Sequence, residues 1–178
     1  MKAIILAAGE GKRMMPLTAE KPKPLLEVLG VPVIDRILGA LPDAIHEVIV
    51  VIGYKGGMIE GHLGTRFAGR KIHYVKQQEL NGHIPALALA RKYLLPGERF
   101  LILPADDLHS KEELARLIAH PFAVGVHESD HPERFGVVMP SDKNTIADIE
   151  EKPERPKSNL ITTMVYVLDD SIFNYVPV

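Results

Sequence analysis

The sequence predicts an α/β fold built on a mainly parallel sheet, with mixed or antiparallel strands in the C-terminal half. Two observations support this. Up to residue 119, short apolar runs alternate with stretches of helical spacing, which is typical of βαβ units. From residue 122 onward, strand-like segments follow one another with few helical signals between them.

The first half is expected to contain four buried strands and four helices. Apolar and β-branched runs predict strands at residues 2–6, 47–52, 71–75 and 99–103. Helical spacing of apolar residues predicts a helix at residues 31–41, and helix-like stretches predict further helices at 58–63, 84–95 and 110–119. Pro32 and Pro42 bracket the first helix, and Ser110 with Glu113 forms a capping box at the start of the last.

The second half is expected to be mostly strands, at residues 122–127, 135–140, 146–150 and 162–168, with a hairpin connection at 141–144. No internal repeat or low-complexity segment divides the chain. We therefore expect one domain over residues 1–178, truncated or minimal at its C-terminus.

Composition narrows the class of protein. The 178 residues are 46% hydrophobic, enough for a substantial core, and a net charge of −2 gives no basic face for nucleic acid. The absence of cysteine excludes disulfides and fits a cytoplasmic location. No apolar stretch approaches the ~20 residues that span a bilayer, and the apolar N-terminus is too short for a secretory signal.

The most informative segment is the N-terminal one, where the apolar run 3–8 leads into Gly9-Glu10-Gly11-Lys12-Arg13. A strand that ends in a glycine-rich turn presents backbone N–H groups to phosphate, and Arg13 and Lys23 can neutralise its charge. Position 14 is methionine, so the turn lacks the third glycine of a Rossmann dehydrogenase.

Residues 9–18 and the following Pro22-Lys23-Pro24-Leu25-Leu26 resemble the signature of sugar-1-phosphate nucleotidyltransferases, with Lys12 in place of a threonine. The resemblance implies a Rossmann-like nucleotide-binding sheet. It also implies that Arg13 and Lys23 are catalytic and hold the nucleotide's phosphates. The residues that wrap the nucleotide would be Leu6, Ala7, Ala8, Gly9 and Gly11.

Two acidic residues, Asp106 and Asp107, follow the strand at 99–103. Adjacent carboxylates at a strand's carboxyl end suit a divalent cation, although an exposed turn with helix-capping acids is an alternative. The resemblance assigns the metal, Mg²⁺, to Asp106 and ranks Asp107 second. The later stretch in which the family carries a second metal ligand has no counterpart in this sequence.

The segment 77–87 occupies the place of the family's base-reading loop. The resemblance implies that Gln77 or Gln78 bonds a base edge and that Gly82 approaches the base or sugar. His83, Ile84 and Pro85 depart from the family pattern, so the identity of the bound base stays open. The alternative is that this segment is a helix N-cap loop that binds no ligand.

Further signature residues lie in the second half. By resemblance, Gly136, Glu151, Lys152 and Asn159 bind the sugar phosphate. Without the N-terminal motif, residues 150–152 would be interpreted as a solvated turn. Met164 stands where the family commonly has a glycine.

The function expected from these observations is Mg²⁺-dependent transfer of a nucleotidyl group from an NTP to a sugar-1-phosphate. Two alternatives stay open: transfer to another phosphate acceptor, and a catalytically silent, nucleotide-binding regulatory relative. The expected binding partners are the two substrates, and neither nucleic acid nor a membrane is expected. Assembly into a homo-oligomer stays open.

Overall fold

A computed structural model describes residues 1–80, 82–141 and 145–175. Contacts between residues divide the chain into two compact units. The first comprises Met1–Ala123 together with the chain from Tyr166 onward, and the second comprises Val124–Val165.

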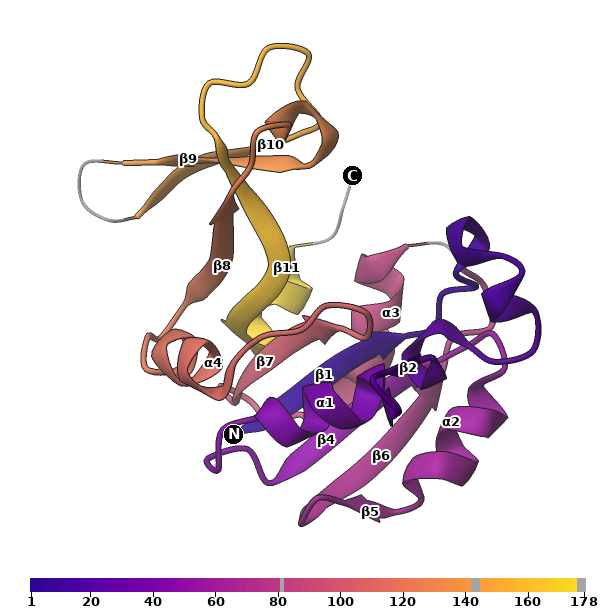
Figure 1. Cartoon of the computed structure of the whole chain (residues 1–178). Helices are drawn as coiled ribbons and strands as arrows, with labels where there is room; N and C mark the ends of the chain where they lie inside the picture. The colour runs from indigo at the N-terminus through magenta and orange to yellow at the C-terminus, as the bar shows by residue number, and fades with distance from the viewer. Residues whose placement is uncertain (81, 142–144, 176–178) are drawn as a thin grey trace. The chain divides into compact units, whose positions relative to one another are not determined.

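The first unit contains the predicted parallel sheet (Figure 1), in the strand order β7-β1-β4-β6-β5. Its parallel strands are β1 (Lys2–Ala7), β4 (Glu47–Ile52), β6 (Arg70–Lys76) and β7 (Arg99–Pro104). The short β5 (Arg66–Phe67) pairs antiparallel with β6. The end of β11 (Leu160–Asp169) pairs antiparallel with β7. The mainly parallel α/β sheet is thereby confirmed.

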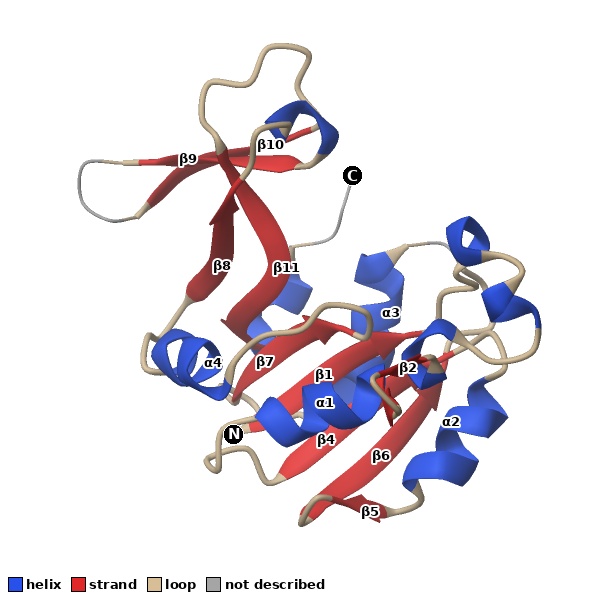
Figure 2. Ribbon diagram, viewed as in Figure 1, coloured by secondary structure: helices blue, strands red, loops and turns tan. Residues whose placement is uncertain are grey.

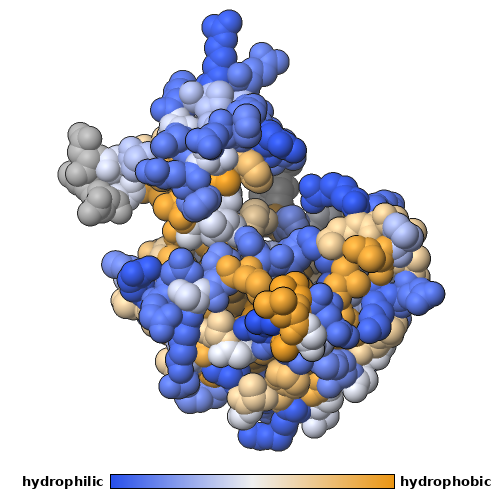
Figure 3. Space-filling view, in the orientation of Figure 1, coloured by the Kyte–Doolittle hydropathy of each residue, from blue (hydrophilic) through white to orange (hydrophobic). Residues whose placement is uncertain are grey.

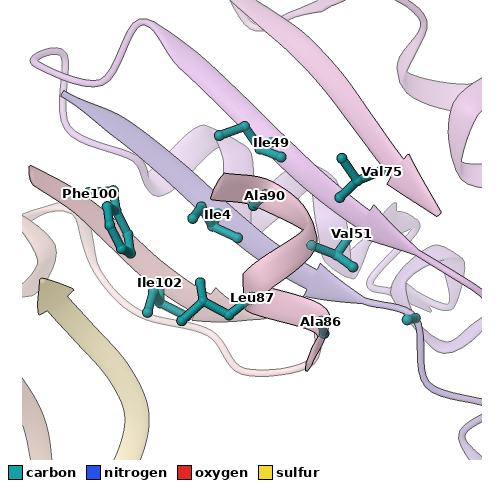
Figure 4. Packing of buried hydrophobic residues seen from close by; sticks show 10 residues of the cluster. Ile4, Ile49, Val51, Val75, Ala86, Leu87, Ala90, Phe100 and Ile102 are labelled. Carbon is teal, nitrogen blue, oxygen red and sulfur yellow. The ribbon is translucent and has the colours of Figure 1, made fainter. Parts of the chain in front are cut away.

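Within the residues that the structure describes, four α-helices accompany this sheet (Figure 2): α1 (Val33–Ala40), α2 (Gly56–Leu63), α3 (His83–Ala90) and α4 (Lys111–Ile118). Small and apolar residues of α3, among them Ala86, Leu87 and Ala90, share one buried cluster with Ile4 of β1 and neighbouring strand residues (Figure 4). This packing holds the start of α3 beside the carboxyl ends of the strands. The predicted capping box at the start of α4 is present.

The bounds of the predicted helices differ from the structure most clearly at two of them. The helix expected at 84–95 ends at Ala90 and tightens into a 3-10 turn at Arg91–Tyr93, as helix ends often do. The helix expected at 31–41 begins only at Val33, because β3 (Val31–Pro32) pairs with β2 (Glu27–Val28) in a small hairpin. Its two turn residues, Leu29 and Gly30, both have positive φ, 51° and 73°.

The second unit contains β8 (Ala123–Glu128) after its first residue, β9 (Gly136–Pro140), β10 (Ile146–Glu151) and the first part of β11. The β9–β10 and β9–β11 pairs are antiparallel, so the predicted change of character in the C-terminal half is confirmed. Of the hairpin connection expected at 141–144, residues 142–144 lie outside the described residues. The Ser141 N–H donates to the Thr145 carbonyl at 2.8 Å.

Hydrophobic side chains also reach the surface. On the face drawn in Figure 3 they form separate patches among hydrophilic residues. The most exposed large apolar side chain of the described residues is Leu29, at 93%. Within the same residues, no helix is long and apolar enough to cross a membrane.

Candidate active site

A cavity of about 610 Å³ lies in the first unit, at the carboxyl ends of β1 and β7 and beside the start of α3. In open α/β sheets, ligands bind in the crevice outside the carboxyl ends of the parallel strands. The predicted residues of the first unit that line it are Leu6, Ala7, Ala8, Gly9, Gly11, Arg13, Lys23, Gln77, Gly82 and Asp106. Residues far apart in the sequence thus surround one cavity.

Residues 8–20, here called the signature loop, carry the glycine-rich turn. Gly11 adopts φ +65°, and a Cβ atom there would lie 2.9 Å from Cγ2 of Thr18, so both backbone and space require glycine. The Met14 N–H donates to the Gly11 carbonyl at 2.9 Å, which closes the first 3-10 turn, Lys12–Met14. Gly9 has open space around its Cα, so a ligand can approach the backbone there.

Two opposite charges meet in the lining of the cavity. Lys23 begins the 3-10 turn Lys23–Leu25, and Asp106 follows β7. The ammonium of Lys23 forms an ion pair with Oδ2 of Asp106. Their side chains are 29% and 41% exposed, so solvent and ligands reach both. The second acidic residue, Asp107, is not part of the lining, and its Oδ2 lies 3.9 Å from Nε2 of His109.

The two glutamine candidates differ in position. Gln77 is buried and lines the cavity, whereas Gln78 is exposed and does not. Nε2 of Gln77 donates to the Gly82 carbonyl at 3.1 Å, and the Gln77 N–H donates to the Ile52 carbonyl at 2.8 Å. Gln77 therefore ties the loop before α3 to the end of β4.

The predicted sugar-phosphate residues lie in the second unit. Gly136 pairs with Glu151 across β9 and β10, and a Cβ on Gly136 would lie 3.3 Å from Oε2 of Glu151. Lys152 follows with φ 47°, and its Nζ lies 3.2 Å from Oε1 of Glu151. Gly136, Glu151 and Lys152 are therefore neighbours. The fourth predicted residue, Asn159, accepts a hydrogen bond at its backbone carbonyl from the Ser129 N–H at 2.9 Å.

Sequence reasoning missed several residues that line the cavity, namely Lys12, Met14, Pro24, Leu80, His83, Ala86, Pro104 and Ala105. Most of them are neighbours of predicted residues and carry no chemical signal of their own. Lys12 does carry one, because it adds a third cation to the lining. It is 84% exposed and pairs with Glu10 at 2.7 Å.

A glycine-rich turn at the carboxyl edge of a parallel sheet, with basic side chains beside it, is typical of nucleotide-binding α/β proteins. Comparison with known proteins specifies the class further. Residues 2–177 match the model of the nucleotidyl transferase family, and the chain belongs to this family. The predicted resemblance to sugar-1-phosphate nucleotidyltransferases is confirmed.

Similar proteins cover almost the whole chain. It is 35% identical to the bifunctional protein GlmU of Methanocaldococcus jannaschii, over 99% of this chain and 42% of GlmU. It is 32% identical to the UTP–glucose-1-phosphate uridylyltransferase AglF of Haloferax volcanii, over 98% of this chain and 74% of AglF. The chain thus spans about two fifths of the GlmU relative.

A solved structure agrees with the fold. A Bacillus anthracis protein assigned as a glucose-1-phosphate thymidylyltransferase, in complex with a sucrose, superimposes with a TM-score of 0.85 and 29% identity. The match covers 98% of this chain and 74% of the other. The Rossmann-like nucleotidyltransferase fold is thereby confirmed.

Proposed function

We propose that this protein transfers a nucleotidyl group from an NTP to a sugar-1-phosphate, giving an NDP-sugar and pyrophosphate. One observation carries the proposal: the glycine turn, Arg13, Lys23 and Asp106 all line a single cavity at the carboxyl edge of the sheet. This set combines backbone donors, two cations and one carboxylate, which is the chemistry that a triphosphate requires.

In the proposed reaction a phosphate oxygen of the sugar-1-phosphate attacks the α-phosphorus of the NTP. The bond between the α-phosphorus and the bridging oxygen breaks, and pyrophosphate leaves. Both substrates are anions, so catalysis consists mainly of positioning and of neutralising charge. Arg13 and Lys23 supply positive charge at the phosphates, and the backbone around Gly9 and Gly11 lets the nucleotide approach closely.

The donor set of the cavity fits Mg²⁺ delivered with the nucleotide. Among the described residues, no three His, Cys, Asp or Glu side chains cluster into a cage for a metal ion. Mg²⁺ in phosphoryl-transfer sites commonly uses one or two carboxylates together with phosphates and water, so a lone Asp106 in a phosphate pocket suits it. When bound, the ion would neutralise charge on the phosphates, and Asp106 would hold it.

The base would lie toward Gln77 and Gly82, which shape the part of the cavity next to α3. Recognition of the sugar phosphate is assigned to Gly136, Glu151, Lys152 and Asn159 on the family signature. In the second unit, Lys152 offers an exposed ammonium and Glu151 an exposed carboxylate, which suit a phosphate and sugar hydroxyls respectively.

The deciding experiment measures pyrophosphate release, with mass detection of the NDP-sugar, across a grid of NTPs and sugar-1-phosphates with Mg²⁺. UTP with glucose-1-phosphate is the first pair, because AglF, the relative covered over 74% of its length, is named for it. The thymidine nucleotide with glucose-1-phosphate is the second, from the name of the solved neighbour. Asp106→Asn is the blank.

Product from one pair that is lost in the blank supports the proposal and identifies the substrates. Nucleotide binding without product across the whole grid contradicts it and favours a silent, regulatory relative. Product formed with a phosphate acceptor other than a sugar-1-phosphate would show that the protein is a nucleotidyltransferase for that other acceptor.

A further inference from the structure

The segment that follows β4 lies directly against the start of the signature loop. The Tyr54 N–H donates to the Ala8 carbonyl at 3.0 Å. A Cβ atom on Gly53 would lie 2.7 Å from that same carbonyl oxygen, so the two backbones are in close contact. Because β1 and β4 are parallel neighbours, their carboxyl ends bring residues 53–55 and Ala8 to the same edge of the sheet.

The same segment also holds the far end of the signature loop. The Tyr54 hydroxyl donates to the Thr18 carbonyl at 3.1 Å. The Lys55 ammonium donates to the Ala19 carbonyl and, at 3.0 Å, to the Glu20 carbonyl. Three consecutive carbonyls of the loop are thus bonded by two neighbouring side chains.

Thr18 connects these hydrogen bonds to the glycine turn. It is fully buried, and its hydroxyl donates to the Gly11 carbonyl at 3.0 Å. Gly11 lies between Gly9 and Arg13, the residues assigned to nucleotide binding. A continuous series of bonds therefore runs from Tyr54, through Thr18, to the turn.

We propose that Tyr54, Lys55 and Thr18 are positioning residues that hold the signature loop in the conformation that binds the nucleotide. None of the three lines the cavity, so they act through the loop and not on the substrate. If the loop spends less time in the competent conformation, the apparent affinity for nucleotide falls by the same fraction. This inference rests on the proposed function for the identity of the ligand.

Two substitutions remove a single hydroxyl each: Tyr54→Phe and Thr18→Val. Thr18→Ser keeps the hydroxyl and is the conservative rescue. The matched control is Tyr74→Phe, because the Tyr74 hydroxyl also donates to a backbone carbonyl, that of Gly64 at 2.6 Å, and neither residue lines the cavity. All variants are made in the full chain.

The first readout is the NTP dissociation constant by calorimetry, with the NTP that the grid selects or with UTP. Loss of one such hydrogen bond is expected to weaken binding about fivefold in Tyr54→Phe and Thr18→Val. Thr18→Ser and Tyr74→Phe should bind within about twofold of wild type, a difference well below the effect of a lost bond. In turnover, KM should rise with kcat nearly unchanged, since nucleotide-bound protein has the loop in place.

The second readout, hydrogen–deuterium exchange by mass spectrometry, needs no activity. Peptides covering residues 9–20 should exchange faster in Tyr54→Phe and Thr18→Val than in wild type, and unchanged in Tyr74→Phe. Unchanged exchange, or faster exchange with unchanged affinity, overturns the inference. A wild type that binds NTP without turnover contradicts the proposed function alone, and the affinity and exchange comparisons still decide the role of these residues.

Discussion

Lys23 and Asp106 form an ion pair in the lining of the candidate cavity, although they lie 83 positions apart in the chain. Lys23 comes from the turn after the signature loop and Asp106 from the end of β7. The pair joins the group proposed to hold phosphate to the group proposed to hold Mg²⁺. These two groups are therefore neighbours in the lining of the cavity.

We predict that Lys23→Met and Asp106→Asn each lower turnover by about 100-fold or more, because each removes a charge aimed at the reacting phosphates. The stability of both variants should change by less than about 1 kcal/mol, since a partly exposed ion pair contributes little. Initial rates of pyrophosphate release and urea unfolding measure the two quantities.

The matched control is Lys111→Met, which breaks an ion pair of Lys111 with Asp43 at 2.8 Å, away from the cavity lining. It should leave turnover unchanged. Turnover of Lys23→Met near that of the control would refute the assigned role of Lys23.

The candidate site was largely predictable because its chemistry-bearing residues follow strands. Arg13 and Asp106 come after the buried runs that became β1 and β7, and parallel neighbours present their carboxyl ends at one edge. Tyr54 and Thr18 were not predictable. Their bond joins a hydroxyl to a backbone carbonyl 36 residues away, and carbonyls leave no trace in a sequence.

In the fold, too, some elements could be predicted from the sequence and others could not. The strand predicted at 47–52 has the observed bounds of β4, because a continuous β-branched run is buried on both faces. The β2–β3 hairpin was missed because its turn is Leu29-Gly30, whereas the sequence signal for such turns is Asn-Gly or Asp-Gly. At Leu29 the pairing of β2 with β3 therefore outweighs the preference of leucine for a negative φ.

Gly53 provides a test of the close contact with Ala8. Gly53→Ala should destabilise the protein by about 1–3 kcal/mol, because the new methyl group would lie 2.7 Å from the Ala8 carbonyl oxygen. The control is Gly61→Ala in α2, where a Cβ has open space. That control should stabilise by roughly 0.5–1 kcal/mol, since alanine is the better helix former. Equal effects of the two substitutions in urea unfolding would contradict the contact.

Leu29 is expected to be a stabilisation site. It is 93% exposed and holds φ 51°, a conformation that asparagine tolerates better than leucine. Leu29→Asn should therefore raise the free energy of unfolding by about 1 kcal/mol, which for a chain of this size raises Tm by about 2–4 °C. Gly30→Ala, at φ 73° in the same turn, should lower stability by about 1 kcal/mol. Thermal unfolding of the two variants tests the opposite signs.

The capping box of α4 should make stability depend on pH. The Glu113 carboxylate accepts from the Ser110 N–H at 2.8 Å and from the Ser110 hydroxyl at 3.0 Å. These bonds hold the pKa of Glu113 below its ordinary value of 4.5 in the folded protein. In the unfolded chain the bonds are absent, so between the two pKa values the unfolded state binds more protons and stability rises with pH.

Glu113→Gln should therefore cost most stability above the ordinary pKa of 4.5, and the cost should shrink as pH falls through the lower, folded pKa. Urea unfolding of both proteins at a series of pH values from neutral to acidic measures this difference. Glu112→Gln, in the same first turn of α4, corrects for the loss of one negative charge near the helix N-terminus. A cost of Glu113→Gln that stays constant across the whole series, after this correction, would show that the carboxylate's bonds to Ser110 do not stabilise the fold.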